Sequence, residues 1–595
     1  MNIFSRVPIA RPKRNVFNLS HERKFSCNMG KLIPIFVEDL VPGDVFRNSS
    51  EIFMRFAPML APVMHRVNVY THFFFVPNRL VMPKWSDFIT GNDSTVTLPA
   101  FDLMMFTDAK YNDLMLDGSL ADYMGLPTRR TGSTFLVNHL SYQCLPFLAY
   151  QLIYNEYYRD QDLQEPVDID YENFDSGNAK DKYAEIMTLR TRSWEKDYFT
   201  SAAPWAQKGD PVLIPGTGSR GRYAPVIYDA VRDEGPAPGD GHTIVSNRGT
   251  NQTPYEPSGF DINTGQVTSG SDFGVHSNFI GKFPGFQQRL GVTVRDTSDP
   301  MFDRYKLGVS DIDPNGNLWA DIGAATDDKS SRSLSDWPPS DKRKFDGATI
   351  NDLRTAFQIQ KWLERNARAG SRYIEQILSH FGVRTPDSRL QRPEYLGGGK
   401  SPVVISEVLQ TSETNETAQG NMAGHGVSAG VTNRFKYEAL EHGYIIGIMS
   451  VMPRTAYQQG IPRHFLRQDK FDFFWPTLAH LGEQPIYNQE LYHNFDVGSS
   501  ENSGVFGYQS RYSEYRYIPS TVHGDFRGKN SFWHLGRMFS ELPKLNEEFI
   551  KCNPSTRIFA VEDESEQKLW VQLYNNCHAV RPMPRYAEPG LVDHF

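Results

Sequence analysis

The sequence predicts a mainly β protein with long irregular connections and a few helices. Aromatic residues make up 13% of the 595 residues, with 39 Phe and 28 Tyr, and such side chains favour strands. The 46 Gly and 38 Pro are typical of turns and loops. A chain of this length can bury a sizeable core, as several domains or as one large β domain with insertions.

The chain as a whole is acidic, but basic residues gather at its N-terminus. The formal net charge is −8, which argues against a protein that coats nucleic acid with its whole surface. Residues 1–31 carry seven basic residues against Glu22, a side-chain charge of +6, and Pro8 and Pro12 disfavour a helix. We interpret residues 1–60 as an extended basic arm and lead-in. The arm is either a solvated terminus or a DNA-facing segment, whose contacts would be Arg6, Arg11, Lys13, Arg14, Arg23, Lys24 and Lys31.

Residues 61–214 are expected to form the first part of the β domain. Over 63–76 the side chains alternate with a period of two and are rich in β-branched and aromatic types, which predicts a long strand that ends at Pro77. Residues 145–158 predict a helix, because Pro146 is tolerated in a first turn and Leu148 and Leu152 share one face.

The composition changes over residues 215–345. Gly, Ser, Thr, Asn, Asp and Pro dominate, apolar periodicity is faint, and Gly-Asp-Gly at 239–241 is a turn signal. Aromatic residues persist, which argues against plain disorder. A loop of this length is uncommon in a compact domain unless it is functional or folds as a subdomain. We interpret it as an insertion that packs against its own copies.

The last part, 346–595, begins with an expected helix pair over 349–381 and then returns to β structure. Thr349 and Ser371 are the expected N-terminal caps of the two helices, and Gly382 the end of the second. Their apolar stripes are interpreted as packing faces: Leu353, Ala356, Phe357 and Leu363 in the first helix, and Ile374, Ile377, Leu378 and Phe381 in the second. Residues 444–452 predict a core strand, and 557–561 with 568–573 predict a hairpin around the acidic turn 562–566.

The catalytic and metal signals are weak. Gly426 to Gly430 match the GxSxG pattern around Ser428, but a small-residue loop is expected before it where a hydrolase needs a strand. The run at 397–401 lacks the first glycine of a phosphate loop, and Pro402 obstructs the following helix, so we expect a flexible glycine loop there. No histidine pair has metal-ligand spacing, and the four cysteines form no CxxC pair. We therefore expect no enzyme activity, metal or cofactor, and also no signal peptide and no membrane span.

Six stretches resemble the major capsid proteins of the Microviridae, specifically of the gokushovirus type. They occur in the family's order and cover nearly the whole chain except about 215–345. They are YNEYYRDQ (154–161), KDYFTSA (196–202), QRPEYLGG (391–398), QGNMAGHG (419–426), WPTLAHLGEQ (475–484) and FGYQSRYSEYR (506–516).

The resemblance implies an eight-stranded viral jelly-roll β-sandwich with long interstrand insertions. Similar subunits form a T=1 icosahedral shell around circular single-stranded DNA, in a virion assembled in the cytoplasm of a bacterial host. The resemblance implies as partners further copies of the chain, a small basic DNA-packaging protein, an internal scaffolding protein, a minor pilot protein and a host surface receptor. It also implies that the insertion 215–345 forms a threefold spike, whose expected residues are Asp240, Asn251, Tyr255, Phe279, Phe283 and Trp319.

Two other classes of function remain open from the residues alone. One is a trimeric β-sandwich module that binds a receptor or a glycan and encloses no genome. The other is a hydrolase that uses Ser428, which would lose its activity in the Ser428→Ala variant.

Overall fold

The computed structural model describes residues 13–102, 108, 110–128, 141–173, 179–210, 212, 350–409, 422–431, 434–495, 499–561, 563 and 565–586, and the backbone of six short strands within 213–349. The chain divides into two compact units. Unit 1 combines Met1–Pro211 with Gln360–Phe595, and unit 2 is Val212–Ile359.

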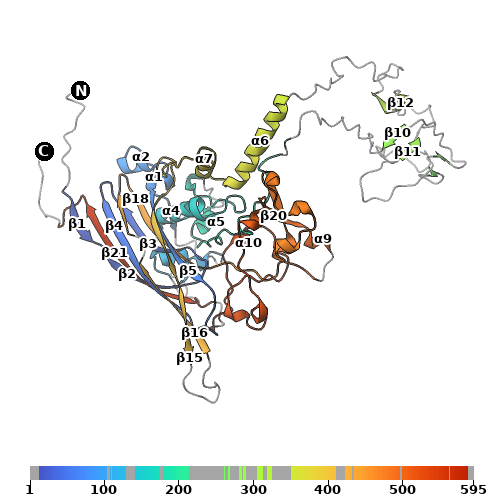
Figure 1. Ribbon diagram of the computed structural model, residues 1–595. Helices are drawn as coiled ribbons and strands as arrows, with labels where there is room; N and C mark the ends of the chain where they lie inside the picture. Colours follow the sequence, from blue (N-terminus) through green and yellow to red (C-terminus); the bar gives the residue numbers. More distant parts are fainter. Residues whose placement is uncertain are drawn as a thin grey trace. The chain divides into compact units, whose positions relative to one another are not determined.

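Unit 1 is built on two antiparallel sheets (Figure 1). The seven-stranded sheet contains β1 Asn15–Asn18, β2 His21–Cys27, β4 Val45–Phe56, β15 Val404–Leu409, β16 Met422–Val431, β17 Phe435–Glu438 and β21 Leu569–Arg581. The four-stranded sheet contains β3 Ile33–Leu40, β5 Val67–Pro77, β14 Glu394–Pro402 and β18 Gly443–Pro453.

The order of the strands is that of a jelly roll. In one sheet the main strands run β2-β21-β4-β16, and in the other β3-β18-β5-β14. Successive strands along the chain alternate between the sheets, except β5 and β14, which are neighbours in the same sheet. This is the eight-stranded sandwich of two Greek keys that the resemblance implies. The mainly β jelly-roll prediction is therefore confirmed.

The core between the sheets follows from side-chain alternation. Along β21 every second residue from Leu569 to Ala579 is buried, and β4 alternates in the same way. In contrast, β5 and β18 are buried on both faces, since one face meets the other sheet and the opposite face meets the insertions. The strand predicted at 444–452 is confirmed as β18. The strand predicted at 63–76 is β5, which begins four residues later and includes Pro77.

The chain between β5 and β14 supplies most of the helices. Of these, α4 packs against β5 and β18 on the outer face of the four-stranded sheet, through a second apolar core (Figure 1). The helix predicted at 145–158 is α4 up to residue 153, followed by a single π turn, Tyr154–Tyr158. The described α-helices are α1 Asn78–Val81, α2 Trp85–Thr90, α3 Leu120–Met124, α4 Leu145–Ile153, α5 Ala179–Ile186, α6 Ile350–Ala369, α7 Tyr373–Phe381, α8 Asn488–Leu491, α9 Ser499–Asn502 and α10 Glu547–Ile550.

The chain between β18 and β21 forms a second insertion, 454–568. Its short strands β19 Glu483–Tyr487 and β20 Val505–Ser510 pair with each other, as do β6 Ala100–Asp102 and β7 Ser141–Gln143 in the first insertion. A third apolar core holds this insertion together around Ile486, Phe506 and Phe549. Its 3-10 turns are Arg463–Phe465, Lys470–Asp472, Pro476–Leu478, Ser513–Tyr515, Gly524–Arg527 and Ser531–Trp533, and two further turns, Asn112–Met115 and Tyr171–Asn173, lie in the first insertion.

Unit 2 contains three described hairpins. They are β8 Phe260–Asp261 with β9 Gln266–Val267, β10 Ile280–Phe283 with β11 Phe286–Arg289, and β12 Tyr305–Ile312 with β13 Leu318–Ala324. The unit interrupts the chain between β5 and β14, and the insertion expected at 215–345 lies within its range.

Several local predictions are wrong. Residues 557–561 form no strand. Of the strand predicted at 568–573, residues 569–573 are the start of β21, which pairs with β4 and β2 instead of a hairpin partner. The glycine run at 397–401 is not a flexible loop but part of β14, paired with β5. Residues 422–425 belong to β16, while 416–421 lie outside the described residues. The helix pair is present and Gly382 ends α7 with φ 69°, but α7 starts after Arg372, one residue beyond the expected cap.

Candidate assembly and nucleic-acid surfaces

Of the predicted DNA-facing residues, some are exposed, some have partners inside the subunit and some lie outside the described residues. Lys13 and Arg14 are exposed immediately before β1, and Lys24 is exposed on β2 with an ion pair of 3.4 Å to Glu22. Arg6 and Arg11 lie outside the described residues. The segment after residue 14 is not an arm, because β1 and β2 both pair with β21 in the seven-stranded sheet.

Arg23 and Lys31 are bound inside the subunit. Arg23 donates to the carbonyl oxygen of Tyr123 at 2.5 Å, and Lys31 Nζ donates to Thr191 Oγ1 at 3.1 Å. Burial lowers the pKa of both groups. The charge count over residues 1–31 gives no sign of these partners, and for this reason both residues were predicted to face DNA. The structure leaves Lys13, Arg14 and Lys24 as the described candidates.

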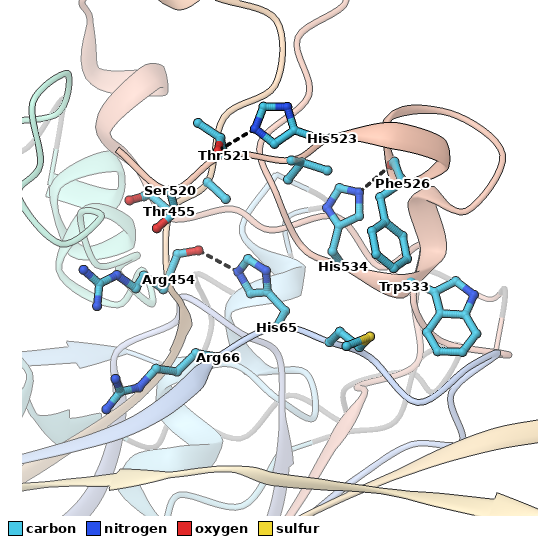
Figure 2. A pocket seen from close by; sticks show the side chains of 13 residues that line it. His65, Arg66, Arg454, Thr455, Ser520, Thr521, His523, Phe526, Trp533 and His534 are labelled. Carbon is cyan, nitrogen blue, oxygen red and sulfur yellow. Dashed lines mark hydrogen bonds between the residues drawn. The ribbon is translucent and has the colours of Figure 1, made fainter. Parts of the chain in front are cut away.

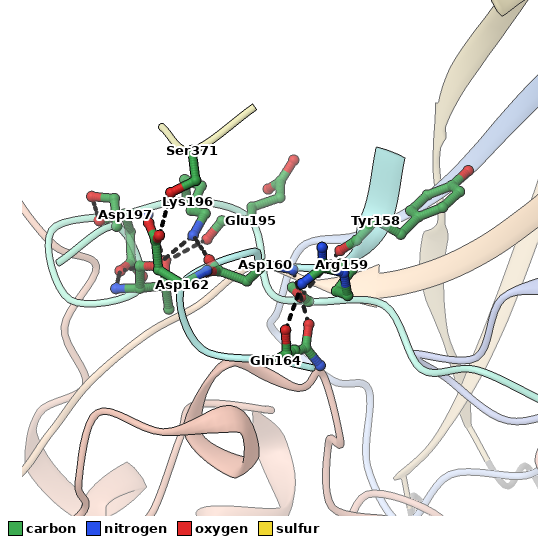
Figure 3. Close-up of polar contacts among 12 residues, drawn as sticks. Tyr158, Arg159, Asp160, Asp162, Gln164, Glu195, Lys196, Asp197 and Ser371 are labelled. Atoms are coloured by element: carbon green, nitrogen blue, oxygen red, sulfur yellow. Dashed lines mark hydrogen bonds and ion pairs between the residues drawn. The ribbon is translucent and has the colours of Figure 1, made fainter. Parts of the chain in front are cut away.

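The stretches that carry the family resemblance contact one another (Figure 3). Lys196 Nζ lies 2.5 Å from Asp160 Oδ2, which joins the second stretch to the first. Arg392 from the third stretch lies over the Tyr157 ring, 4.2 Å from its centroid, and the Tyr157 hydroxyl donates to the Pro393 carbonyl at 2.5 Å. Contacts between these motifs therefore hold the insertions against the sandwich.

Asp197 organises the second stretch. One carboxylate oxygen accepts from the backbone N–H groups of Phe199 and Thr200 at 2.9 and 2.8 Å. The other accepts from the hydroxyls of Thr455 at 2.6 Å and Tyr457 at 2.7 Å. The aspartate is 6% exposed, and burial with the carboxylate raises the pKa of Tyr457. A buried carboxylate with donors on both of its oxygens is a structural anchor for the two insertions.

Asp162 joins the chain segments that lead to and from unit 2. Lys208 Nζ lies 3.3 Å from Asp162 Oδ1, and the hydroxyl of Ser371 donates to the same oxygen (Figure 3). Ser371 was predicted as a helix cap, but its side chain serves this contact instead. Both partners lie in unit 1, so the contact closes the base of the segment 209–370.

A group of large apolar side chains is exposed on the second insertion. We call Phe465, Phe471, Phe473, Phe474, Trp475 and Tyr515 the aromatic surface, and each is between 48% and 72% exposed. The largely buried Arg467 guanidinium lies over the ring of Tyr515 at 4.4 Å and pairs with Glu514 at 3.4 Å. Rigidly held aromatic side chains with an arginine are the composition of protein interfaces, and such a patch on one chain indicates contact with another.

The helix pair also exposes part of its apolar stripes. Phe357, Trp362, Leu378 and Phe381 are 62%, 54%, 42% and 78% exposed, whereas Ala356 is buried. Of the stripes predicted as packing faces, these four side chains are therefore not covered within the described residues.

The catalytic candidates have no catalytic geometry. Ser428 lies inside β16 instead of at a strand-to-helix turn, and its buried hydroxyl donates to the Pro402 carbonyl at 3.0 Å. Three histidines line a cavity of about 280 Å³ near Trp533 (Figure 2). His65 contacts the Arg454 carbonyl at 2.6 Å, His523 the Thr521 hydroxyl at 2.8 Å, and His534 the Phe526 carbonyl at 2.8 Å.

Each of the three histidine rings is hydrogen-bonded to a neighbouring protein group. Burial lowers the pKa of His65 to about 4 and also lowers the pKa of His534, which favours the neutral form of both rings. Across the described parts of the chain no group of three His, Cys, Asp or Glu side chains is arranged to hold a metal ion. The four cysteines are buried and unpaired, and burial raises the pKa of Cys27 to about 12.

The predicted protrusion residues are only partly described. Phe283 ends β10 and Trp319 lies in β13, where it is opposite Asp311. Asp240, Asn251, Tyr255 and Phe279 lie outside the described residues. No described helix has the length and hydropathy that a membrane span requires.

Comparison with known proteins agrees with this architecture. The family model described as "Capsid protein (F protein)" matches residues 5–591. The chain is 36% identical to capsid protein VP1 of Chlamydia phage 1 over 99% of this chain and 98% of the relative. It is 33% identical to capsid protein VP1 of Bdellovibrio phage phiMH2K, over 100% and 98%, and 29% identical to that of Spiroplasma virus 4, over 97% and 95%. The jelly roll, the surfaces suited to subunit contact and a match over the whole length agree: the chain belongs to the F capsid protein family of the Microviridae and is a structural component of a phage virion.

Proposed function

We propose that copies of this chain close into a T=1 icosahedral shell around circular single-stranded DNA. The observation that carries the proposal is the aromatic surface. Six large side chains are held in place on the second insertion without a partner among the described residues that would cover them. Burying them between identical chains removes apolar area from water, at about 25 cal/mol per Å². Contacts of this kind between different patches of identical subunits close into a shell when the rotations close.

The DNA would meet the N-terminal segment. Arg6, Arg11, Lys13 and Arg14 precede β1, and a cation that contacts a phosphate releases condensed counterions. The few basic residues of one segment cannot neutralise the share of a packed genome that belongs to one subunit. A separate small basic packaging protein is therefore part of the proposal, together with a scaffolding protein and a pilot protein during assembly.

Unit 2 would be the host-attachment spike. It is an insertion between two sandwich strands, and loops on a rigid scaffold are where recognition surfaces are usually built. Three such insertions around a threefold axis would place Phe283 and Trp319 in the protrusion.

Electron microscopy of the chain expressed with its packaging partners tests the proposal. We expect closed shells with icosahedral symmetry that contain nuclease-protected single-stranded DNA. A soluble trimer without nucleic acid would instead favour a receptor- or glycan-binding module and would refute the shell.

A further inference from the structure

The outer face of the seven-stranded sheet carries aromatic and cationic side chains in register. This face is the side of β21 and β4 that points away from the four-stranded sheet, and no described helix lies on it (Figure 1). Trp570 is 49% exposed on it, and Phe53 and Tyr574 are each 37% exposed. Large aromatic side chains on an uncovered sheet face are costly in water unless something binds there.

The three rings form a zigzag across two strands. Phe53 on β4 is opposite Gln572 on β21, so it is the diagonal neighbour of both Trp570 and Tyr574. Diagonal neighbours in an antiparallel pair are about 7–8 Å apart, which places the rings at similar steps along the face. Exposed rings spaced in this way offer successive stacking positions for unpaired bases.

Cations lie beside Trp570 and Phe53, whereas Tyr574 is opposite Glu51 on β4 and Glu22 on β2. Arg55 is opposite Trp570, and its guanidinium lies 5.2 Å from the centroid of the Phe53 ring. Lys24 is opposite Gln572 on the other side of β21. Both are exposed, and Lys24 also pairs with Glu22 at 3.4 Å. The Arg55 guanidinium is close enough to the Phe53 ring to contact the phosphate of a nucleotide whose base is stacked there.

A second feature of the same face points to an anion. Arg47 on β4 is directly opposite Lys436 on β17, and His578 on β21 is opposite Arg47 from the other side. Like charges directly opposite each other destabilise a sheet. Glu438 lies two residues from Lys436 on the same face of β17, but neither Arg47 nor Lys436 forms an ion pair among the described residues, so no direct pairing within this part of the chain relieves the repulsion. A bound phosphate would do so.

The face also continues into the N-terminal segment. Asn18 of β1 is opposite His578, in the same row as Arg47, and Lys13 and Arg14 come directly before β1. The row of cations thus lies between the basic segment and the aromatic zigzag. Along β21 the distance from His578 to Trp570 is eight residues, about 27 Å at 3.4 Å per residue.

We propose that this face is a stacking platform for single-stranded DNA, with bases on Trp570, Phe53 and Tyr574 and phosphates on Arg55, Lys24, Arg47 and Lys436. This proposal rests on the proposed function, because the shell must enclose DNA. It adds which residues bind that DNA. Stacking and phosphate contact make no demand on base identity, so the platform accepts any sequence.

Ultraviolet cross-linking of DNA-filled particles, followed by mass spectrometry of the peptides, tests the platform directly. We expect nucleotide adducts on the peptides that contain Phe53, Trp570 or Tyr574. A matched experiment measures the binding of an oligo-dT probe to the unassembled full chain. Each change among Phe53→Leu, Trp570→Leu and Tyr574→Leu should weaken binding about tenfold, whereas Phe495→Leu, at an exposed ring on the second insertion, should not.

The cations Arg47 and Lys436 are tested separately, by the salt dependence of binding. The Arg47→Gln, Lys436→Gln double variant should reduce the slope of log affinity against log salt by about one to two, with melting temperature unchanged or raised. The platform is refuted if filled particles give adducts only elsewhere. It is also refuted if a variant with all three changes, Phe53→Leu, Trp570→Leu and Tyr574→Leu, binds oligo-dT as the parent does but no longer assembles. The face would then be a subunit contact. Wild-type shells that never contain DNA would instead refute the proposed function.

Discussion

Arg463 and Glu490 form an ion pair inside the second insertion, with 2.7 Å between Nη1 and Oε1 and a glutamate side chain that is 2% exposed. The carboxylate also accepts from the hydroxyl of Tyr198 at 3.0 Å and from the backbone N–H of Tyr487 at 2.9 Å. Burial raises the pKa of Glu490, and Arg463 acts in the opposite direction. The pair ties α8 to the turn that leads to the aromatic surface.

Removing one member of this pair should be costly. Glu490→Ala leaves the Arg463 guanidinium with only the more distant carboxylate of Glu514, 4.0 Å from Nε, and we expect about 3 kcal/mol less stability. Thermal or denaturant unfolding of the unassembled chain measures the loss. The control is Glu22→Ala, which removes an exposed ion pair on β2 and should cost about 0–1 kcal/mol. Equal effects of the two variants would contradict the assignment.

Glu483 should make stability depend on pH. Burial raises its pKa to about 7, while Arg368 Nε, 2.5 Å from Oε1, favours the charged form. Between about pH 4.5 and pH 7, Glu483 therefore keeps its proton in the folded chain but loses it in the unfolded chain. The contribution of Glu483 to stability thus rises as the pH falls through 7 and is complete below 4.5, up to about 3 kcal/mol.

Melting temperatures of the parent and the Glu483→Gln variant between pH 5 and 8 test this. The difference between the two isolates Glu483, because other groups such as His65 titrate in both chains. We expect the parent to gain stability relative to the variant as the pH falls. Glu501→Gln, at an exposed position, is the control, and a constant difference from pH 5 to 8 would contradict the prediction.

Gly424 in β16 should not accept a side chain. A Cβ there would lie 2.3 Å from the carbonyl oxygen of Ala61 and within 3 Å of the Pro62 backbone. Gly424→Ala must displace backbone, and we expect a loss of about 1–3 kcal/mol. Ala423→Ser, at the adjacent exposed position, should be nearly neutral in the same unfolding experiment. A stable Gly424→Ala variant would show that the two segments separate easily.

How much of this fold follows from sequence alone depends on where each strand finds its partners. The apolar run of β18 is enough to place it, because the strand is buried on both faces wherever it pairs. β14 was missed, since its glycines look like a loop until β5 supplies the partner. A Cβ atom added at Gly398 would lie 2.4 Å from the carbonyl oxygen of Thr71.

The start of β21 was placed in the wrong pairing for the same reason. Lys568 to Leu573 have strand character, but their partners on β4 and β2 lie more than 500 residues away. The site shows the same limit. Charge counting found Lys13 and Arg14, whereas the alternation that puts Phe53 beside Trp570 and Tyr574 requires the register of two distant strands.

The aromatic surface should be needed for assembly and not for folding. Phe471→Ser and Trp475→Ser each remove a large exposed side chain, and interface aromatic residues often contribute 2 kcal/mol or more per contact. We expect both variants to keep the parent melting temperature as unassembled chains but to form few or no shells in size-exclusion chromatography and electron microscopy. Ile89→Ser, an exposed apolar position on α2, is the control for a general loss of apolar surface.

Shortening unit 2 should separate attachment from assembly. The contact of Lys208 and Ser371 with Asp162 closes the base of this segment within unit 1, so deleting 225–335 and joining the ends leaves the sandwich and its anchors in place. We expect intact, DNA-filled shells by electron microscopy and a loss of host-cell binding of tenfold or more in a particle-adsorption assay. An Asp162→Asn variant of the full-length chain keeps unit 2 and weakens only its base, so it should retain most adsorption. Failure of the shortened chain to form shells, despite a parent-like melting temperature, would place unit 2 in the subunit interface and not in the spike.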